Sequence, residues 1–436
     1  MNKNKYEIDM CNGSIMDKLI SFALPLMLSG ILQLMFNAVD IIVVGHFSSS
    51  QALAAVGSTT ALINVFVNLF IGVSLGTNVL AARCYAAGKD KEMSEVVHTS
   101  ILFALISGIV MAVIGVLLAK PALQLMQTPA DVIDQSALYM RIYFLGMPFF
   151  MLYNYGAAVL RAVGDTKRPL MYLILSGIVN TLLNLFLVIV FRLAVAGVAI
   201  STIIAQCISC ILILNCLRKS ESSYKLTFSG LSIKWVYLRQ IFQVGIPAGI
   251  QSTVINFSNA LLQSSVNSFG STAMAGYTAA NNILGFLYAS VNAVTQACMS
   301  FTSQNFGVGK YKRVDLVLRD CMILTVGVSL VLGGGAYLFG NEVLRIYTND
   351  SEVVRCGVEI LSITTVPYFL CGIMDLFPGS LRGMGYSTVP MILSVVGTVG
   401  MRIFWIYRVF PFHRSLYVLF ISYPASWTFT IIMQVI

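Results

Sequence analysis

The sequence predicts an all-α integral membrane protein with twelve transmembrane helices in two similar halves of six helices. The first observation is composition: of 436 residues, 57% are hydrophobic and only 10% are charged, whereas a soluble domain has about 25% charged residues. The second is length, because crossings of roughly 20 apolar residues with their loops fit about twelve times into the chain. The third is an internal repeat. The composition excludes a soluble enzyme, a disordered chain and a fibrous protein.

Apolar runs separated by short polar segments define the helices in order. The first run starts at Leu19 and is too long for a signal-peptide core, so we expect it to be a retained span. The longest polar interruption divides the chain into an N-terminal lobe of helices 1–6 (1–216), a cytoplasmic linker (217–237) and a C-terminal lobe of helices 7–12 (238–436). The expected spans lie near 19–45, 53–82, 95–119, 132–160, 169–191, 195–216, 238–269, 272–305, 315–339, 352–381, 389–410 and 416–436.

The distribution of basic residues predicts the direction of these spans. With a cytoplasmic N-terminus, 19 of the 27 Lys and Arg residues fall in inside segments and six fall outside, as the positive-inside rule requires. We therefore expect both termini in the cytoplasm and a bacterial-type inner membrane. The net charge of +9 reflects this topology and indicates no nucleic-acid partner. Cys207 and Cys210 form a C-x-x-C within an apolar run, which favours small core residues over redox or metal chemistry.

The two halves share residues at a nearly constant offset. A shift of 221 residues superposes four landmarks, and a shift of 222 superposes two prolines that come early in each half. The pairs are Gly88-Lys89 with Gly309-Lys310, Leu160-Arg161 with Leu381-Arg382, Gly164 with Gly385, Pro169 with Pro390, and Pro25 with Pro247. Because six spans return the chain to the same side, the halves have the same orientation. This is the parallel-repeat form of a secondary transporter, in which substrate sites lie between the halves.

These residues resemble the multidrug and toxic compound extrusion (MATE) family over nearly the full chain. The similarity lies in the segment from Phe36 to Gly45, in Leu160-Arg-Ala-Val-Gly-Asp-Thr-Lys-Arg-Pro169, and in Leu381-Arg-Gly-Met-Gly-Tyr-Ser-Thr-Val-Pro390. The resemblance implies a V-shaped pair of six-helix lobes around a central cleft. It also implies export of amphipathic, often cationic compounds, driven by entry of H⁺ or Na⁺.

Asp40 is the sharpest candidate for the ion-coupling residue, because an ionisable group inside a bilayer is a functional candidate by default. It lies six residues before His46, roughly 9 Å deep at 1.5 Å per residue. Other polar residues at similar depth are expected beside it: Tyr139, Asn180, Asn184 and Thr202. The resemblance implies coupling through Asp40, but the family pattern has an aspartate where this sequence has Asn184. The alternative is a structural ion pair between Asp40 and Arg141.

Polar stripes on the second, seventh and eighth helices are candidates for the substrate cleft, since such stripes avoid lipid. The alternative is hydrogen bonding between packed helices. The cleft candidates are Asn64, Asn68, Asn256, Asn259, Gln263, Tyr288, Asn292 and Gln296. Asp375 lies in the inner half of the tenth span, where it either attracts cationic substrates or extends to the interface.

Two further pairs complete the expected site. Glu359 and Arg402 lie in the outer halves of the tenth and eleventh spans, and we expect a structural ion pair; a cation or substrate site at Glu359 is the alternative. Pro25 and Pro247 each remove a helical hydrogen bond, so they are expected either as hinges or as tolerated kinks.

The sequence carries no P-loop and no histidine pair with metal spacing, so we expect neither an enzyme nor a bound metal or cofactor. The expected function is an H⁺- or Na⁺-coupled antiporter, acting as a monomer on small organic substrates. One alternative is a lipid-linked precursor flippase, which needs deep Lys or Arg in the cleft helices. Another is a metabolite exporter of narrow specificity. A membrane enzyme or a receptor needs a catalytic group set or an extramembrane domain, and neither is visible.

Overall fold

The computed structural model describes residues 6–126 and 128–436, and within these ranges every regular element is a helix. The chain forms two compact units. Unit 1 comprises the segment ending at Ile8 and Ile31–Ile246; unit 2 comprises Asp9–Gly30 and Pro247–Ile436.

The chain passes between the two units three times, first between Ile8 and Asp9 and then inside two helices, α1 (Ile15–Phe47) and α8 (Trp235–Asn267). The passage inside α8 falls at Pro247, one of the expected hinges, whereas Pro25 lies five residues before the passage at Gly30 inside α1. Residues 217–237, the predicted linker, lie within unit 1.

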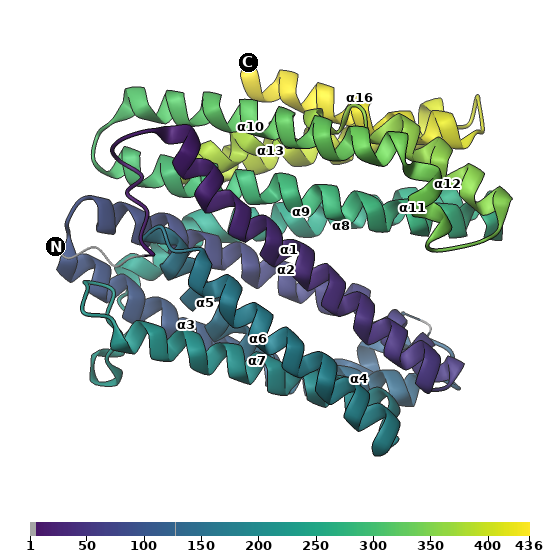
Figure 1. Ribbon diagram of the computed structural model, residues 1–436, viewed down its shortest axis with the longest axis horizontal. Coiled ribbons are helices and arrows are strands. Elements are labelled where there is room, and N and C mark those ends of the chain that lie inside the picture. The colour runs from purple at the N-terminus through teal and green to yellow at the C-terminus, as the bar shows by residue number, and fades with distance from the viewer. Residues whose placement is uncertain (1–5, 127) are drawn as a thin grey trace. The chain divides into compact units, whose positions relative to one another are not determined.

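Unit 1 is a helix bundle in which α3 packs against α4 and α5, and α6 packs against α7 along its length (Figure 1). Helix α2 contacts α3, α4 and α5. Its helices are α2 (Ser50–Ala86), α3 (Asp90–Leu125), α4 (Ile133–Leu145), α5 (Met147–Ala162), α6 (Lys167–Leu185) with the π-helical turn η1 (Phe186–Val190), α7 (Ala194–Lys219) and the short 3-10 turn η2 (Phe228–Gly230).

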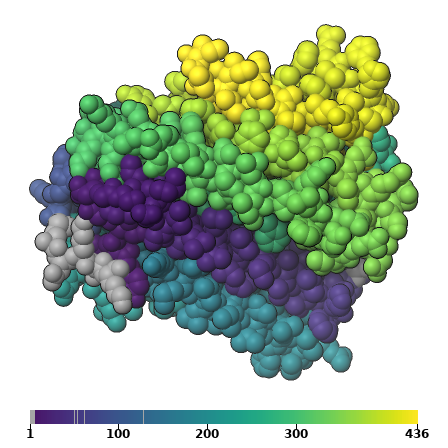
Figure 2. All heavy atoms as spheres, turned by 45° about the horizontal axis from the view of Figure 1, so that its top comes forward, coloured from purple at the N-terminus to yellow at the C-terminus, as the bar shows by residue number. Residues whose placement is uncertain are grey.

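Unit 2 repeats this order, with α9 packed against α10, α12 and α13. The C-terminal helix α16, yellow in Figure 2, lies beside the yellow-green α12 and α13. The helices are α9 (Ser271–Gly307), α10 (Tyr311–Leu338), α11 (Gly340–Arg345), α12 (Ser351–Thr364), α13 (Tyr368–Gly383), α14 (Thr388–Ser394), η3 (Val395–Gly400), α15 (Met401–Phe404), η4 (Trp405–Val409) and α16 (Leu416–Val435).

Most of the predicted spans are present as long apolar helices. By length and composition, nine helices of the described chain are able to cross a membrane, or eleven when two bent pairs are each counted as one span. The bends, 45° between α4 and α5 and 51° between α12 and α13, break spans that the sequence predicts as continuous. Proline explains both, since Pro148 opens α5 and Pro367 precedes α13, and proline suits a helix start but not a helix interior. The predicted seventh span is α8, a 33-residue helix that falls outside this set.

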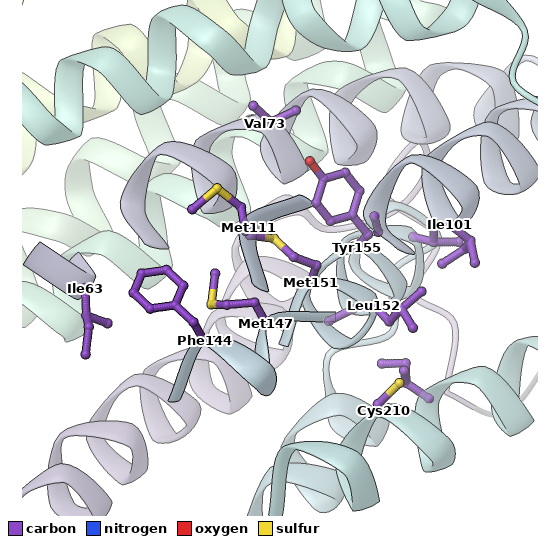
Figure 3. Packing of buried hydrophobic residues seen from close by; sticks show 14 of the residues in the cluster. Ile63, Val73, Ile101, Met111, Phe144, Met147, Met151, Leu152, Tyr155 and Cys210 are labelled. Carbon is purple, nitrogen blue, oxygen red and sulfur yellow. The ribbon is translucent and has the colours of Figure 1, made fainter. Parts of the chain in front are cut away.

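Each unit has its own hydrophobic core. In unit 1, Phe144, Met147, Met151 and Tyr155 lie along the α4–α5 bend and interlock with α2, α3 and α7 (Figure 3). A second core in unit 2 gathers around α9, α12, α13 and α16. Outward-facing leucines such as Leu117 are largely exposed, which suits a helix surface in contact with lipid.

The sequence repeat is also a repeat of backbone turns. Gly164 and Gly385 have φ angles of +94° and +87°, a left-handed conformation that glycine adopts without a steric penalty. In both turns the next residue donates its N–H to the leucine carbonyl of the Leu-Arg pair, at 2.9 Å. This is the hydrogen-bonded helix ending for which glycine is preferred. The glycine before each lysine, Gly88 and Gly309, follows the same rule.

Candidate functional site

Asp40 is held against α6 by a close helix contact one turn away. The Phe36 ring lies directly over Gly177, and a Cβ at that glycine would overlap the ring. Small residues at such contacts let helix backbones approach closely. Because Phe36 precedes Asp40 by four residues, and Gly177 precedes Asn180 by three, the same contact brings the carboxylate to the amides of α6.

The Asp40 carboxylate accepts two hydrogen bonds from α6. Asn180 Nδ2 donates to Asp40 Oδ1 at 3.1 Å, and Asn184 Nδ2 donates to the same oxygen. The Asn184 side chain is fully buried and Asn180 nearly so. The Oδ1 atom of Asn180 is buried without a hydrogen-bond partner. A carboxylate and an unpaired amide oxygen therefore lie together, and oxygen atoms of this kind are the ligands that hard cations prefer.

The predicted neighbours of Asp40 divide into those that reach the cluster and those that do not. Tyr139 is buried and lies within electrostatic range of Asp40, but no hydrogen bond joins the two. Thr202 Oγ1 donates to the carbonyl of Val198 in its own helix. Its neighbour Ser201 donates to Asn184 Oδ1 instead, so the hydroxyl of this cluster belongs to Ser201, which the sequence reasoning missed.

The alternative partner of Asp40, Arg141, is exposed. Within the described ranges no ion pair joins Asp40 to any arginine or lysine. A structural ion pair therefore does not account for Asp40.

Arg402 and Glu359 in unit 2 do not form the predicted ion pair. Arg402 is 3% exposed, its Nη1 donates to Asn259 Oδ1 at 2.7 Å, and its guanidinium lies 4.3 Å from the centroid of the Tyr423 ring. The depth estimate placed the two residues at one level of the bilayer but gave no information on their faces. Asn259, predicted for the substrate cleft, is therefore the partner of Arg402.

A second polar cluster in unit 2 joins α9 to α13 and α8. Gln296 Nε2 donates to Asn292 Oδ1 at 2.8 Å, and Tyr288 lies within electrostatic range of Asp375. Two turns further along α13, Arg382 Nη2 donates to Gln251 Oε1. Asp375 itself has no hydrogen bond or ion pair within the described residues, so it is the free acidic group of this cluster.

Comparison with known proteins identifies the family. The sequence profile of the MatE family matches residues 25–186 and again residues 247–407, so the two matches coincide with the internal repeat. The chain belongs to the MatE family.

Named relatives cover almost the whole MatE chain. The probable multidrug resistance protein YoeA of Bacillus subtilis is 28% identical over 94% of this chain and 91% of its own length. The probable multidrug resistance protein NorM of Thermotoga maritima is 26% identical over 88% and 83%. The multidrug export protein MepA of Staphylococcus aureus is 23% identical over 87% and 84%.

Solved structures share the fold. A crystal structure of MATE in the straight conformation superposes with a TM-score of 0.89 at 19% identity, covering 99% of this chain and 96% of that one. An outward-facing conformation of a multidrug resistance MATE family transporter of the MOP superfamily gives 0.90 at 18% identity, covering 100% and 96%. The chain is thus a multi-pass membrane protein of this fold.

The remaining cleft candidates of the MatE chain present free polar side chains. Asn64, Asn256 and Gln263 are exposed and Asn68 is half-buried. No hydrogen bond is recorded at any of the four in the described part of the chain. Because these side chains form no hydrogen bonds between packed helices of the described chain, they remain available to bind a ligand.

The loop that carries the family resemblance in unit 1 is a buried structural cluster. Asp165 is fully buried and accepts hydrogen bonds from the backbone N–H groups of Lys167 and Arg168, each at 3.1 Å, and from the Arg168 side chain. Burial raises the pKa of Asp165, while Arg168 opposes that rise. The hydrogen bonds of Asp165 therefore fix the start of α6, the helix that supplies Asn180 and Asn184.

A second acid, Glu7, accepts hydrogen bonds from the hydroxyls of Tyr224 and Tyr85 at 2.7 and 2.8 Å.

Proposed function

We propose that this chain is a cation-coupled antiporter that exports amphipathic, chiefly cationic organic compounds across the cytoplasmic membrane by alternating access. Asp40 is the ion-coupling residue. The observation that carries the proposal is the Asp40 carboxylate beside the buried, unpartnered Asn180 Oδ1. Relatives named multidrug resistance or export proteins support export of drugs. In this proposal the protein is a monomer with both termini in the cytoplasm.

Two groups of the cluster, the Asp40 carboxylate and the Asn180 side-chain oxygen, favour a bound cation or proton. An unsatisfied buried acceptor costs about 1–3 kcal/mol, and a carboxylate held away from water favours a bound positive charge. A Na⁺ ion ligated by Asp40 and the Asn180 oxygen satisfies both groups, and so does a proton on Asp40. Coupling follows when the ion and the substrate each stabilise a different state of the transporter.

Substrate binding is proposed at polar side chains that form no hydrogen bonds within the described part of the protein. Asp375, with Tyr288 in range, supplies a negative charge in unit 2 for a cationic substrate. The unbonded amides of α8 in the same unit, Asn256 and Gln263, add polar contacts that tolerate varied shapes. A site of this kind favours broad specificity over tight recognition of one metabolite.

The test is gradient-driven transport in proteoliposomes. Purified wild type and Asp40→Asn are reconstituted, a pH or Na⁺ gradient is imposed, and uptake or release of a fluorescent organic cation is followed. We expect transport with one of the two gradients and loss of at least about tenfold in the variant, because the amide cannot bind the ion as a carboxylate does.

Asp17→Asn is the matched control, since Asp17 is an exposed acid on the same helix, and its transport should equal the wild type. Wild-type rates in Asp40→Asn would refute coupling at this residue. No transport with either gradient in the wild type would contradict antiport of organic cations and favour a flippase or a narrow-specificity exporter.

A further inference from the structure

Arg402 is a buried positive charge for which unit 2 provides no counter-ion. It lies on α15, inside the apolar segment Thr388–Val409, and is 3% exposed. Within residues 6–126 and 128–436, no carboxylate lies within ion-pair distance of its guanidinium. A buried charge without a partner costs several kcal/mol, and arginine in a membrane segment is a functional candidate for the same reason.

Among the described residues, the contacts of Arg402 leave one edge of its guanidinium without a hydrogen-bond partner. Nη1 donates a hydrogen bond to Asn259 Oδ1, and the Tyr423 ring covers one face of the guanidinium. Nε is buried without a partner, and no hydrogen bond is recorded at Nη2. The Nε–Nη2 edge is the fork that binds the two oxygens of a carboxylate in parallel. Nε has almost no accessible surface, so a ligand reaches this edge when the side chains covering it shift.

The Tyr423 ring that covers Arg402 belongs to a cluster of aromatic side chains. Phe420 stacks on Tyr423 with ring centroids 5.9 Å apart, and Trp427 meets Tyr423 edge-on at 5.6 Å. An amphipathic acid has both a charged head and an apolar body. The guanidinium suits the head, and the rings suit the body.

The repeat gives an independent reason to regard this cluster as a site. At the offset of 221 residues, Arg402 corresponds to Thr181 and Tyr423 to Thr202; at the offset of 222, Asn259 corresponds to Asn37. Asn37 lies within one helical turn of Asp40 on α1, Thr181 lies within one turn of Asn180 and Asn184 on α6, and Thr202 on α7 follows Ser201, which donates to Asn184. The same three helices of each repeat thus converge on one ionisable group, an acid in unit 1 and a base in unit 2.

We infer that Arg402, Asn259 and Tyr423 form a carboxylate-binding site within unit 2, and that the exported substrates include amphipathic organic acids and zwitterions. The statement about export rests on the proposed function, whereas the binding of a carboxylate does not.

Binding is measured first, by calorimetry on the purified full chain in detergent with benzoate as the probe. Benzamide is the neutral control of the same shape. We expect benzoate to bind, benzamide not to bind, and Arg402→Gln to weaken benzoate by at least about tenfold, the equivalent of 1.4 kcal/mol. Arg408→Gln, an exposed arginine two turns further along, should bind as the wild type does.

A second variant tests the site without leaving a buried group unpaired. Asn259→Asp places an internal carboxylate beside Arg402, so the fold should be retained and benzoate binding lost. Thermal unfolding checks that Arg402→Gln and Asn259→Asp remain folded. Unchanged benzoate affinity in Asn259→Asp, or in a folded Arg402→Gln, would overturn the inference. Displacement of benzoate by chloride at comparable concentration would also overturn it, by assigning the site to a halide.

Transport then separates this site from ion coupling. Asp40→Asn should lose gradient-driven export of the fluorescent cation and keep benzoate binding. Arg402→Gln should keep cation export and lose both benzoate binding and gradient-driven movement of radiolabelled benzoate. If Asp40→Asn exports normally while Arg402→Gln loses benzoate, the proposed coupling residue fails and the carboxylate site stands. Loss of cation export in a folded Arg402→Gln would contradict a role confined to acids.

Discussion

At the scale of single residues, the orientation of Asn184 depends on one hydroxyl. Ser201 donates to Asn184 Oδ1, which turns the amide so that Nδ2 donates to Asp40. Thr202, the next residue, donates within its own helix. Ser201 therefore belongs to the Asp40 cluster and Thr202 does not, so Thr202 is a matched control for Ser201.

We predict that Ser201→Ala weakens the apparent affinity of the coupling ion roughly 2- to 10-fold, because one hydrogen bond contributes about 0.5–1.5 kcal/mol. Thr202→Val should leave it unchanged. Ion dependence of the transport rate in proteoliposomes measures both. An equal effect of the two substitutions would contradict the role of Ser201.

For single residues, the sequence predicted the depth in the membrane better than the neighbours of each side chain. Distance from a helix end predicted the depth of Asp40, Asn180 and Asn184, and the structure brings these three together. The same reasoning paired Glu359 with Arg402, and it named Thr202 but missed Ser201. Depth along a helix follows from counting, but the face that a side chain occupies depends on how the helices pack, which one sequence does not state.

At the scale of helices, the contact between α1 and α6 is set by a glycine. Phe36 fills the space over Gly177, and the Asp40 hydrogen bonds lie one turn beyond it. The sequence predicted both helices but not this contact, because a glycine inside a helix has several explanations and only packing distinguishes them.

Gly177→Ala should separate α1 from α6 and lower transport, with a loss of stability of about 1–3 kcal/mol from overpacking. Gly327→Ala is the control, since a Cβ at that position meets nothing within 4 Å. Thermal unfolding and transport measure both variants. Phe36→Leu combined with Gly177→Ala should restore much of the loss, and failure of that rescue would argue against the contact as the cause.

At the scale of the whole molecule, the resemblance of three segments predicted the family, and the repeat predicted two halves of the same orientation. The structure adds that the matched glycines Gly164 and Gly385 form equivalent turns. The sequence did not predict that α1 and α8 each divide between the compact units. Repeats are visible in sequence because equivalent turns need equivalent residues. The exchange of helix ends depends on long-range packing, for which the sequence carries no local pattern.

Pro247 lies where α8 passes from unit 1 to unit 2, and proline removes a hydrogen bond from the helix. We predict that Pro247→Ala stiffens this passage and lowers the maximal transport rate several-fold, with ion affinity unchanged. Pro424→Ala is the control, because Pro424 also lies inside a helix but within one unit. Initial rates across substrate and ion concentrations measure both. Equal rates in wild type and Pro247→Ala would exclude a hinge at this proline.

The polar side of α8 has a consequence for biosynthesis. Asn256, Asn259 and Gln263 lie on a helix that composition alone does not mark as a membrane span. Each polar group at mid-membrane opposes release of a nascent helix from the insertion machinery into lipid. Among these three amides, Asn259 has a partner in Arg402, so helix α8 depends on that contact. Arg402 is synthesised more than a hundred residues after α8, so the seventh helix reaches its final membrane position only late in the assembly of its unit.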